Sequence, residues 1–121
     1  MELCHKENIK AICWFLGDCM PLIEDIADVG YDLLVLEQPR IGYDVNLKEI
    51  RNRVDNDLCI SGWLTELEIL KDDRESIKRH IYEQYECAGQ DGAFIYSTSM
   101  SDSNVNPETI DYICDFVGEM D

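Results

Sequence analysis

The sequence predicts an α/β protein made of four consecutive βα units with parallel strands. Four times along the chain, a short apolar run typical of a strand precedes a segment whose apolar residues recur at helical spacing. One of these runs, LLVL at 33–36, is apolar without alternation, as in strands that are covered on both faces of a parallel sheet. With 121 residues, of which 45% are hydrophobic, the chain is long enough to form a single domain, 1–121, with a sizeable core.

The first two units fill the first half of the chain. A strand is expected within 9–16, and Gly30 ends the helix that follows it. A second strand is expected within 31–37, followed by a short amphipathic helix. The apolar residues that define these two helices are Leu22, Ile23 and Ile26 in the first, and Leu47, Ile50 and Val54 in the second.

The third and fourth units follow the same plan. A strand at 58–61 leads to a helix that begins after Asp72 or Asp73 and ends at Gly89. The last strand is expected at 93–97, and Asn106 followed by Pro107 is a typical start of the last helix. Parallel strands joined in this way form either an open doubly wound sheet or a consecutive part of a barrel, and periodicity alone does not separate the two.

Charge and composition narrow the classes of partner and compartment. The formal charge of −16 disfavours binding to nucleic acid or to an anionic membrane, because both carry the same sign. No apolar run approaches the roughly 20 residues of a membrane span, and the N-terminal MELCHKENIK lacks the pattern of a signal peptide, so we expect a cytoplasmic protein. The six cysteines include no CxxC pair, and we interpret them as reduced and mostly buried thiols.

Four motifs, taken in order, resemble a known family. GDCMPLIEDIADVGYDLL at 17–34, LEQPRIGYDV at 36–45, ISGW at 60–63 and NPETIDYI at 106–113 are similar to the C-terminal half of the uroporphyrinogen decarboxylase superfamily, which includes cobalamin-dependent methyltransferases. The resemblance implies that residues 9–121 are the last four βα units of a (β/α)8 TIM barrel. It implies that residues 1–8 are the end of the preceding helix, and that the chain is half of the barrel.

The resemblance also locates the family's functional positions. Methyltransferases of this superfamily would have zinc-binding His and Cys at the positions of Trp14 and Leu16, and a third ligand near Met100. Neither Trp14 nor Leu16 binds a metal, so we predict no metal, no cofactor and no catalytic residue. Their apolar side chains are then expected to cover surface, or alternatively to form a binding pocket between Trp14 and Trp63.

Polar residues at the strand ends are the remaining candidates for binding a small molecule. We predict Asp18, Glu37, Asp44 and Ser99 as ligand-binding residues. Glu37 and Asp44 match acidic positions of the family, and Ser99 lies near a histidine position of the decarboxylases. The alternative interpretation of the acidic residues is solvated loop carboxylates and helix caps. The two histidines, His5 and His80, fall among charged residues of helices and are expected at the surface.

Two functions from different classes follow from these residues. The first is a degenerate, non-catalytic half barrel that forms a homo-oligomer or pairs with a complementary half-barrel chain. The alternative is a methyltransferase, moving a methyl group from a corrinoid or a methylated substrate, that is active only when a partner chain supplies the missing half. Both predict an assembly, because four βα units taken from a barrel expose apolar surface and two strand edges.

Overall fold

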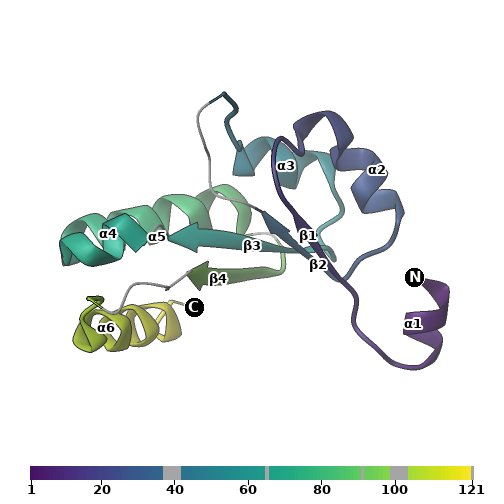
Figure 1. Ribbon diagram of the computed structural model, residues 1–121. Helices are drawn as coiled ribbons and strands as arrows, with labels where there is room; N and C mark the ends of the chain where they lie inside the picture. Colours follow the sequence, from purple (N-terminus) through teal and green to yellow (C-terminus); the bar gives the residue numbers. More distant parts are fainter. Residues whose placement is uncertain (37–41, 65, 91, 99–103, 121) are drawn as a thin grey trace.

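The computed structural model describes residues 1–36, 42–64, 66–90, 92–98 and 104–120. Four strands in these residues form one sheet in the order β1-β2-β3-β4, and every neighbouring pair is parallel (Figure 1). The strands are β1 Ile12–Phe15, β2 Leu33–Leu36, β3 Cys59–Leu64 and β4 Phe94–Thr98. The prediction of an α/β protein with four parallel strands is confirmed. The order lacks the reversal that defines a doubly wound sheet.

Helices separate the strands in the sequence. They are α1 Glu2–Lys6, the 3-10 turn η1 Met20–Leu22 with α2 Ile23–Asp28, α3 Leu47–Arg53, α4 Glu66–Lys71, α5 Arg74–Ala88 and α6 Pro107–Gly118. None of the helices in the described part of the chain has the length and apolar character that a bilayer crossing needs.

Local sequence signals fix several of the helix ends. Asn46, Asp73 and Asn106 are the N-caps of α3, α5 and α6, and each side chain accepts a hydrogen bond from a backbone N–H of the first turn. Gly30 has a φ of +85° and follows the end of α2, in the left-handed conformation that glycine adopts without strain. One expectation needs correction, since Val54 lies just beyond α3 in extended backbone, although its side chain is still buried.

The helices α2, α3, α5 and α6 pack against the same side of the sheet. Leu34 and Ile60, which are neighbours in the register of β2 and β3, share one core cluster with residues of α2, α3 and α5. Tyr96 of β4 packs in a second cluster with α4, α5 and α6. The buried helix residues of these clusters are Ile23, Ile26, Leu47, Ile50 and Ala88 in the first, and Ile69, Ile77, Ile81 and Ile113 in the second.

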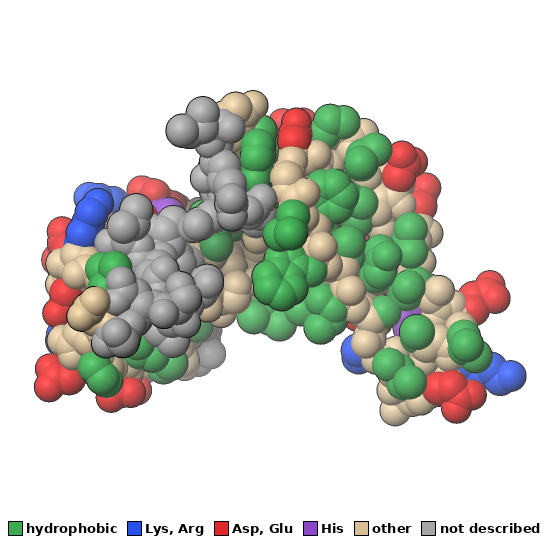
Figure 2. All heavy atoms as spheres, in the orientation of Figure 1, with side chains coloured by type: hydrophobic (Ala, Val, Ile, Leu, Met, Phe, Trp, Pro, Cys, Tyr) green, Lys and Arg blue, Asp and Glu red, His purple; other side chains and the backbone are tan. Residues whose placement is uncertain are grey.

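The opposite side of the sheet, which we call the open face, exposes several apolar side chains, most of them on β1. Its apolar residues are Ile12, Trp14, Leu33, Val35 and Ile95, and neither core cluster contains any of them. The register also places Cys59, Ser61 and Ser97 on this side, and Ser61 is only 2% exposed. Ile12, Trp14 and Ile95 are 60%, 74% and 48% exposed, and Leu16, directly after β1, is 68% exposed. Figure 2 shows hydrophobic side chains gathered in the middle of the view, where Figure 1 labels β1 and β2.

The cysteines are less buried than the sequence suggested. All six are free thiols, but Cys19 alone is fully buried, and Cys114 on α6 is exposed. Burial raises the pKa of the Cys13, Cys19 and Cys59 thiols above the ordinary value, so these three stay protonated at neutral pH.

Candidate functional site

The acidic residues predicted at the strand ends hold their own loops together. Asp18 follows β1, and its Oδ1 accepts a hydrogen bond from the backbone N–H of Met20 at 3.0 Å. Asp44 precedes α3, and its Oδ1 accepts from the N–H of Val45 at 2.9 Å. Both side chains therefore act in the way that loop and capping carboxylates do. Glu37 and Ser99 lie outside the described residues, as does Met100.

The zinc site that the resemblance to methyltransferases would place at the end of β1 does not fit the residues found there. The indole nitrogen of Trp14 carries a hydrogen and has no free lone pair, and the side chain of Leu16 has no nitrogen, oxygen or sulfur atom. Neither side chain can therefore bind a metal ion. Both side chains are also directed to solvent in this subunit. Across the described ranges, no group of three or more His, Cys, Asp or Glu side chains lies close enough together to hold a metal ion.

Asp44 also lines a shallow groove between the start of α3 and the middle of α5. The groove has a volume of about 270 Å³, and the side chains that give it chemical character are Asp44, Trp63, His80, Glu83, Gln84 and Cys87. Trp14 is not among the residues that line this groove. Trp63 instead packs against the first core cluster.

The side-chain amide of Gln84 completes the edge of β3 beside this groove. β2 pairs with β3 only as far as Ser61, which leaves the backbone of Trp63 beyond the end of β2. Gln84 Oε1 accepts from the Trp63 N–H at 2.8 Å, and Gln84 Nε2 donates to the Trp63 carbonyl at 2.5 Å. A single buried side chain thus satisfies both backbone groups, as a neighbouring strand would.

Gly62 provides the space for this amide. A Cβ atom at this position would lie 2.6 Å from the ring of Phe94 and would also overlap with Gln84 Oε1. The absent side chain therefore lets α5 approach the sheet closely.

His80 extends the same network toward α4. Its Nε2 lies 2.6 Å from Gln84 Nε2, and its Nδ1 lies 3.3 Å from Glu68 Oε1. Because Gln84 Nε2 is a donor, His80 Nε2 must accept, which assigns the proton to Nδ1, facing the carboxylate. His80 is therefore a partly buried member of a network, rather than the plain surface histidine that the sequence suggested.

The hydroxyl groups near the ends of β3 and β4 are also occupied. Tyr96 donates to the Trp63 carbonyl at 3.1 Å, and burial, with the negative charge of Glu68 as a smaller cause, raises the pKa of its phenol well above the ordinary value. Ser97 donates to the Gly62 carbonyl at 2.9 Å, and Ser61 donates to Ser97 at 2.8 Å. In the described part of the chain, no buried side-chain nitrogen or oxygen lacks a hydrogen-bond partner. The network is therefore built to hold the strand ends in place.

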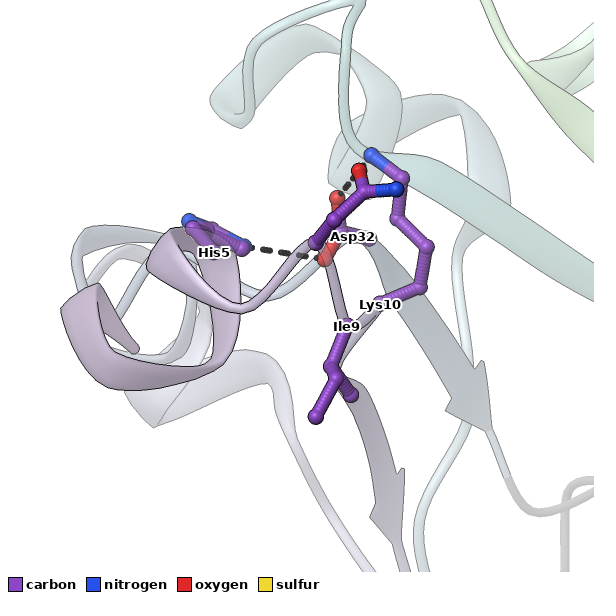
Figure 3. A pocket seen from close by; sticks show the side chains of 5 residues that line it. His5, Ile9, Lys10 and Asp32 are labelled. Atoms are coloured by element: carbon purple, nitrogen blue, oxygen red, sulfur yellow. Dashed lines mark hydrogen bonds and ion pairs between the residues drawn. The ribbon is translucent and has the colours of Figure 1, made fainter.

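A second polar cluster lies at the opposite, amino-terminal end of the sheet (Figure 3). The carboxylate of Asp32, directly before β2, accepts from Lys10 Nζ at 2.7 Å and from the backbone N–H of Ala11 at 2.8 Å, and lies 3.0 Å from His5 Nε2. These contacts connect α1 and the segment before β1 to the start of β2. The hydrogen bond from Lys10 is the main cause that holds the pKa of Asp32 well below the ordinary value, followed by those from Ala11 and His5.

Replacing Asp32 with asparagine is expected to loosen the attachment of α1. A lowered pKa in the folded state means that this carboxylate contributes stability above its ordinary pKa, and that the contribution disappears as the pH falls toward the folded-state pKa. In Asp32→Asn, the backbone N–H of Ala11 loses its hydrogen bond to the carboxylate. At neutral pH this amide should therefore exchange with solvent roughly tenfold faster than in the unchanged protein, as measured by NMR. Asp28→Asn, which changes an exposed carboxylate on α2, is the matched control and should leave this rate unchanged.

In comparisons with known proteins, no protein-family model matches the chain, and no curated protein sequence matches it.

Proposed function

We propose that the chain is a non-catalytic half-barrel subunit, and that its open face closes against a second four-stranded half. The observation that carries this proposal is the one-sided packing of the sheet. Four helices cover one side, and the open face exposes Ile12, Trp14 and Ile95 to solvent. In a (β/α)8 barrel, helices cover the outer side of the strands, and apolar side chains of the inner side fill the centre.

The strand order supports the same assembly. Consecutive parallel strands without a reversal are the arrangement found along the wall of a barrel. The sheet also ends in two edge strands, β1 and β4, that have no neighbour within the described residues. Unpaired edges beside an apolar surface favour association with another chain. Burying each large apolar side chain of the open face would contribute about 1.5–3 kcal/mol.

The polar residues favour a non-catalytic role. The polar side chains near the ends of β3 and β4 are engaged with one another and with the backbone, and Trp14 and Leu16 offer no ligand for a metal. A general base or nucleophile needs a partner that activates it and open access to substrate. We therefore propose that the assembled rim, with Asp18 and Asp44 among its residues and Glu37 and Ser99 as further candidates, binds a small molecule without transforming it.

The mass of the purified protein in solution tests the assembly. Light scattering at micromolar concentration is expected to give at least twice the 14.0 kDa of one chain, or one chain in a stable complex with a different half barrel when the two are produced together. A stable, soluble species of one chain that binds no other half would contradict the proposal.

The alternative, a methyltransferase active only with a partner chain, shares the assembly but differs in metal content. It requires a soft-ligand zinc site, and the end of β1 does not provide one. Stoichiometric zinc that chelators remove from the purified protein would favour this alternative over the non-catalytic subunit.

A further inference from the structure

We infer that the partner half is a second copy of this chain, related by a two-fold axis that coincides with the barrel axis, with β1 of each subunit beside β4 of the other. This inference rests on the half-barrel function proposed above. It adds the identity of the partner, the symmetry of the complex and the pair of strands that meet.

The geometry of the sheet allows one chain to complete itself in this way. A two-fold rotation about the barrel axis keeps the strands of both copies running toward the same end of the barrel, so two copies give eight parallel strands. The sheet of one copy begins with β1 and ends with β4, and these two edges are different. Placing β1 of one copy after β4 of the other continues the order at both junctions. Two identical junctions then close the ring and leave no edge.

A cavity beside the β4 edge is an independent observation that supports this pairing. It has a volume of about 220 Å³ and is lined by Ile81 and Tyr85 of α5, Phe94 and Tyr96 of β4, and Val117 and Met120 near the end of α6. It lies on the helix-covered side of an edge strand, where the outward-facing side chains of a following strand would pack in a complete barrel.

The helix-facing side chains of β1 match this cavity in chemistry. They are Cys13 and Phe15, and both are only partly buried in their own subunit. With β1 of the second copy beside β4, Phe15 of that copy would point toward the space below α6. An apolar cavity next to one edge and a half-buried aromatic ring on the other edge are complementary.

The helix that accompanies β1 also has an uncovered apolar side. Leu22 and Val29, at the two ends of α2, are 45% and 46% exposed. Within its own subunit, α2 packs beside α3. In the closed ring, the other flank of α2 lies next to α6 of the second copy, and these two side chains would be covered there.

The charge of the chain predicts how salt acts on this dimer. Each copy has a formal charge of −16, so the two copies repel each other, and added salt screens this repulsion. Dimerisation should therefore become stronger as the salt concentration rises. A complementary half of basic character would show the reverse dependence.

A charge exchange across the junction tests the pairing. Ile12 of β1 and Ile95 of β4 are exposed residues of the open face on the two edge strands, so Ile12→Lys and Ile95→Glu should leave the single subunit folded. Each variant alone is expected to raise the dimer dissociation constant roughly tenfold or more, measured by sedimentation equilibrium. In an equimolar mixture, the introduced lysine of one chain and the introduced glutamate of the other meet at one junction, and the second junction is that of the unchanged protein. Adjacent strands lie about 4.8 Å apart, so the two long introduced side chains can reach each other across the junction, and the mixture should recover a heterodimer.

Asn52 on α3 provides the matched control for both charge changes. Asn52→Lys and Asn52→Glu make the same two charge changes at an exposed position of α3 and should not affect dimerisation. If the unchanged protein is monomeric alone but binds a different half barrel, the partner is not a second copy of this chain, and the proposed function still holds. A dimer of the unchanged protein whose two variants show no recovery on mixing would overturn the β1–β4 pairing alone. A chain that binds neither a second copy nor any other half would overturn both.

Discussion

Replacing Arg51 with methionine is expected to lower the free energy of unfolding by about 3–5 kcal/mol, because the guanidinium group satisfies four buried or partly buried backbone carbonyls. Arg51 lies on α3 and is only 7% exposed. It donates to the carbonyls of Ala88 at 3.0 Å, Leu58 at 3.0 Å, Ala93 at 2.8 Å and Asp55 at 3.2 Å. The methionine side chain fills similar space but leaves these acceptors without a donor.

The four carbonyls lie around one point, and only a side chain with several N–H donors, such as arginine, can satisfy all of them. They belong to the end of α5, to the loop before β3 and to the residue before β4, so one side chain connects three segments at the amino-terminal end of the sheet. Burial lowers the pKa of Arg51 from its ordinary value, yet arginine remains charged at neutral pH. Gly92 leaves room for the group, since a Cβ there would lie 2.7 Å from Arg51 Cζ.

The neighbouring Arg53 provides a matched control for this measurement. It lies on the same helix and forms ion pairs with Glu24 and Glu49 at the surface. Because solvent screens such pairs, Arg53→Met should cost less than about 1 kcal/mol in the same urea denaturation experiment. Equal losses for the two variants would show that the buried carbonyls find other partners and that Arg51 is dispensable.

The elements of the fold could be predicted because their signals are local. An unbroken apolar run such as 33–36 belongs to a covered strand wherever it occurs, and a cap such as Asn106 before Pro107 is recognised within one helical turn. Strand and helix identities therefore required no knowledge of distant contacts. The positions of side chains relative to distant segments required that knowledge.

Arg51 and Gln84 illustrate what the sequence alone did not reveal. Both are long polar residues within amphipathic helices, and such residues most often face solvent. Their burial depends in part on carbonyl and amide groups that lie 21 to 42 residues away in the chain. One signal was available for Gln84, since Gly62 interrupts the third strand, and a glycine within a strand often marks a close approach of another group.

The open face illustrates a different limit. The sequence indicated that Trp14 and Leu16 would cover surface, because apolar side chains at a strand end are usually buried. Their exposure in the single subunit could not be predicted from local pattern, because it depends on whether other elements pack on that side of the sheet. The same residues that a pattern assigns to a core are therefore the ones that an assembly would cover.

Trp14→Glu is expected to abolish assembly while the single subunit stays folded. In an assembled barrel, the variant would lose the burial of the indole, worth about 1.5–3 kcal/mol, and would also bring an unpaired carboxylate into an apolar centre. Together these effects should raise the dissociation constant at least about 100-fold, which light scattering at a series of concentrations measures. In the single subunit, the Trp14 side chain is 74% exposed, so its loss should change the free energy of unfolding by no more than about 0.5 kcal/mol.

If Trp14→Glu loses assembly but stays folded, Trp14 belongs to a binding surface and not to the core of the single subunit. Leu3→Glu makes a comparable change at a residue of α1 that is 73% exposed and lies outside the open face, and it should retain the mass of the unchanged protein. If Trp14→Glu kept that mass too, the open face would not be the surface that associates. If Trp14→Glu instead unfolded at a lower urea concentration in its monomeric form, Trp14 would stabilise the single subunit, and its exposure would not mark an interface.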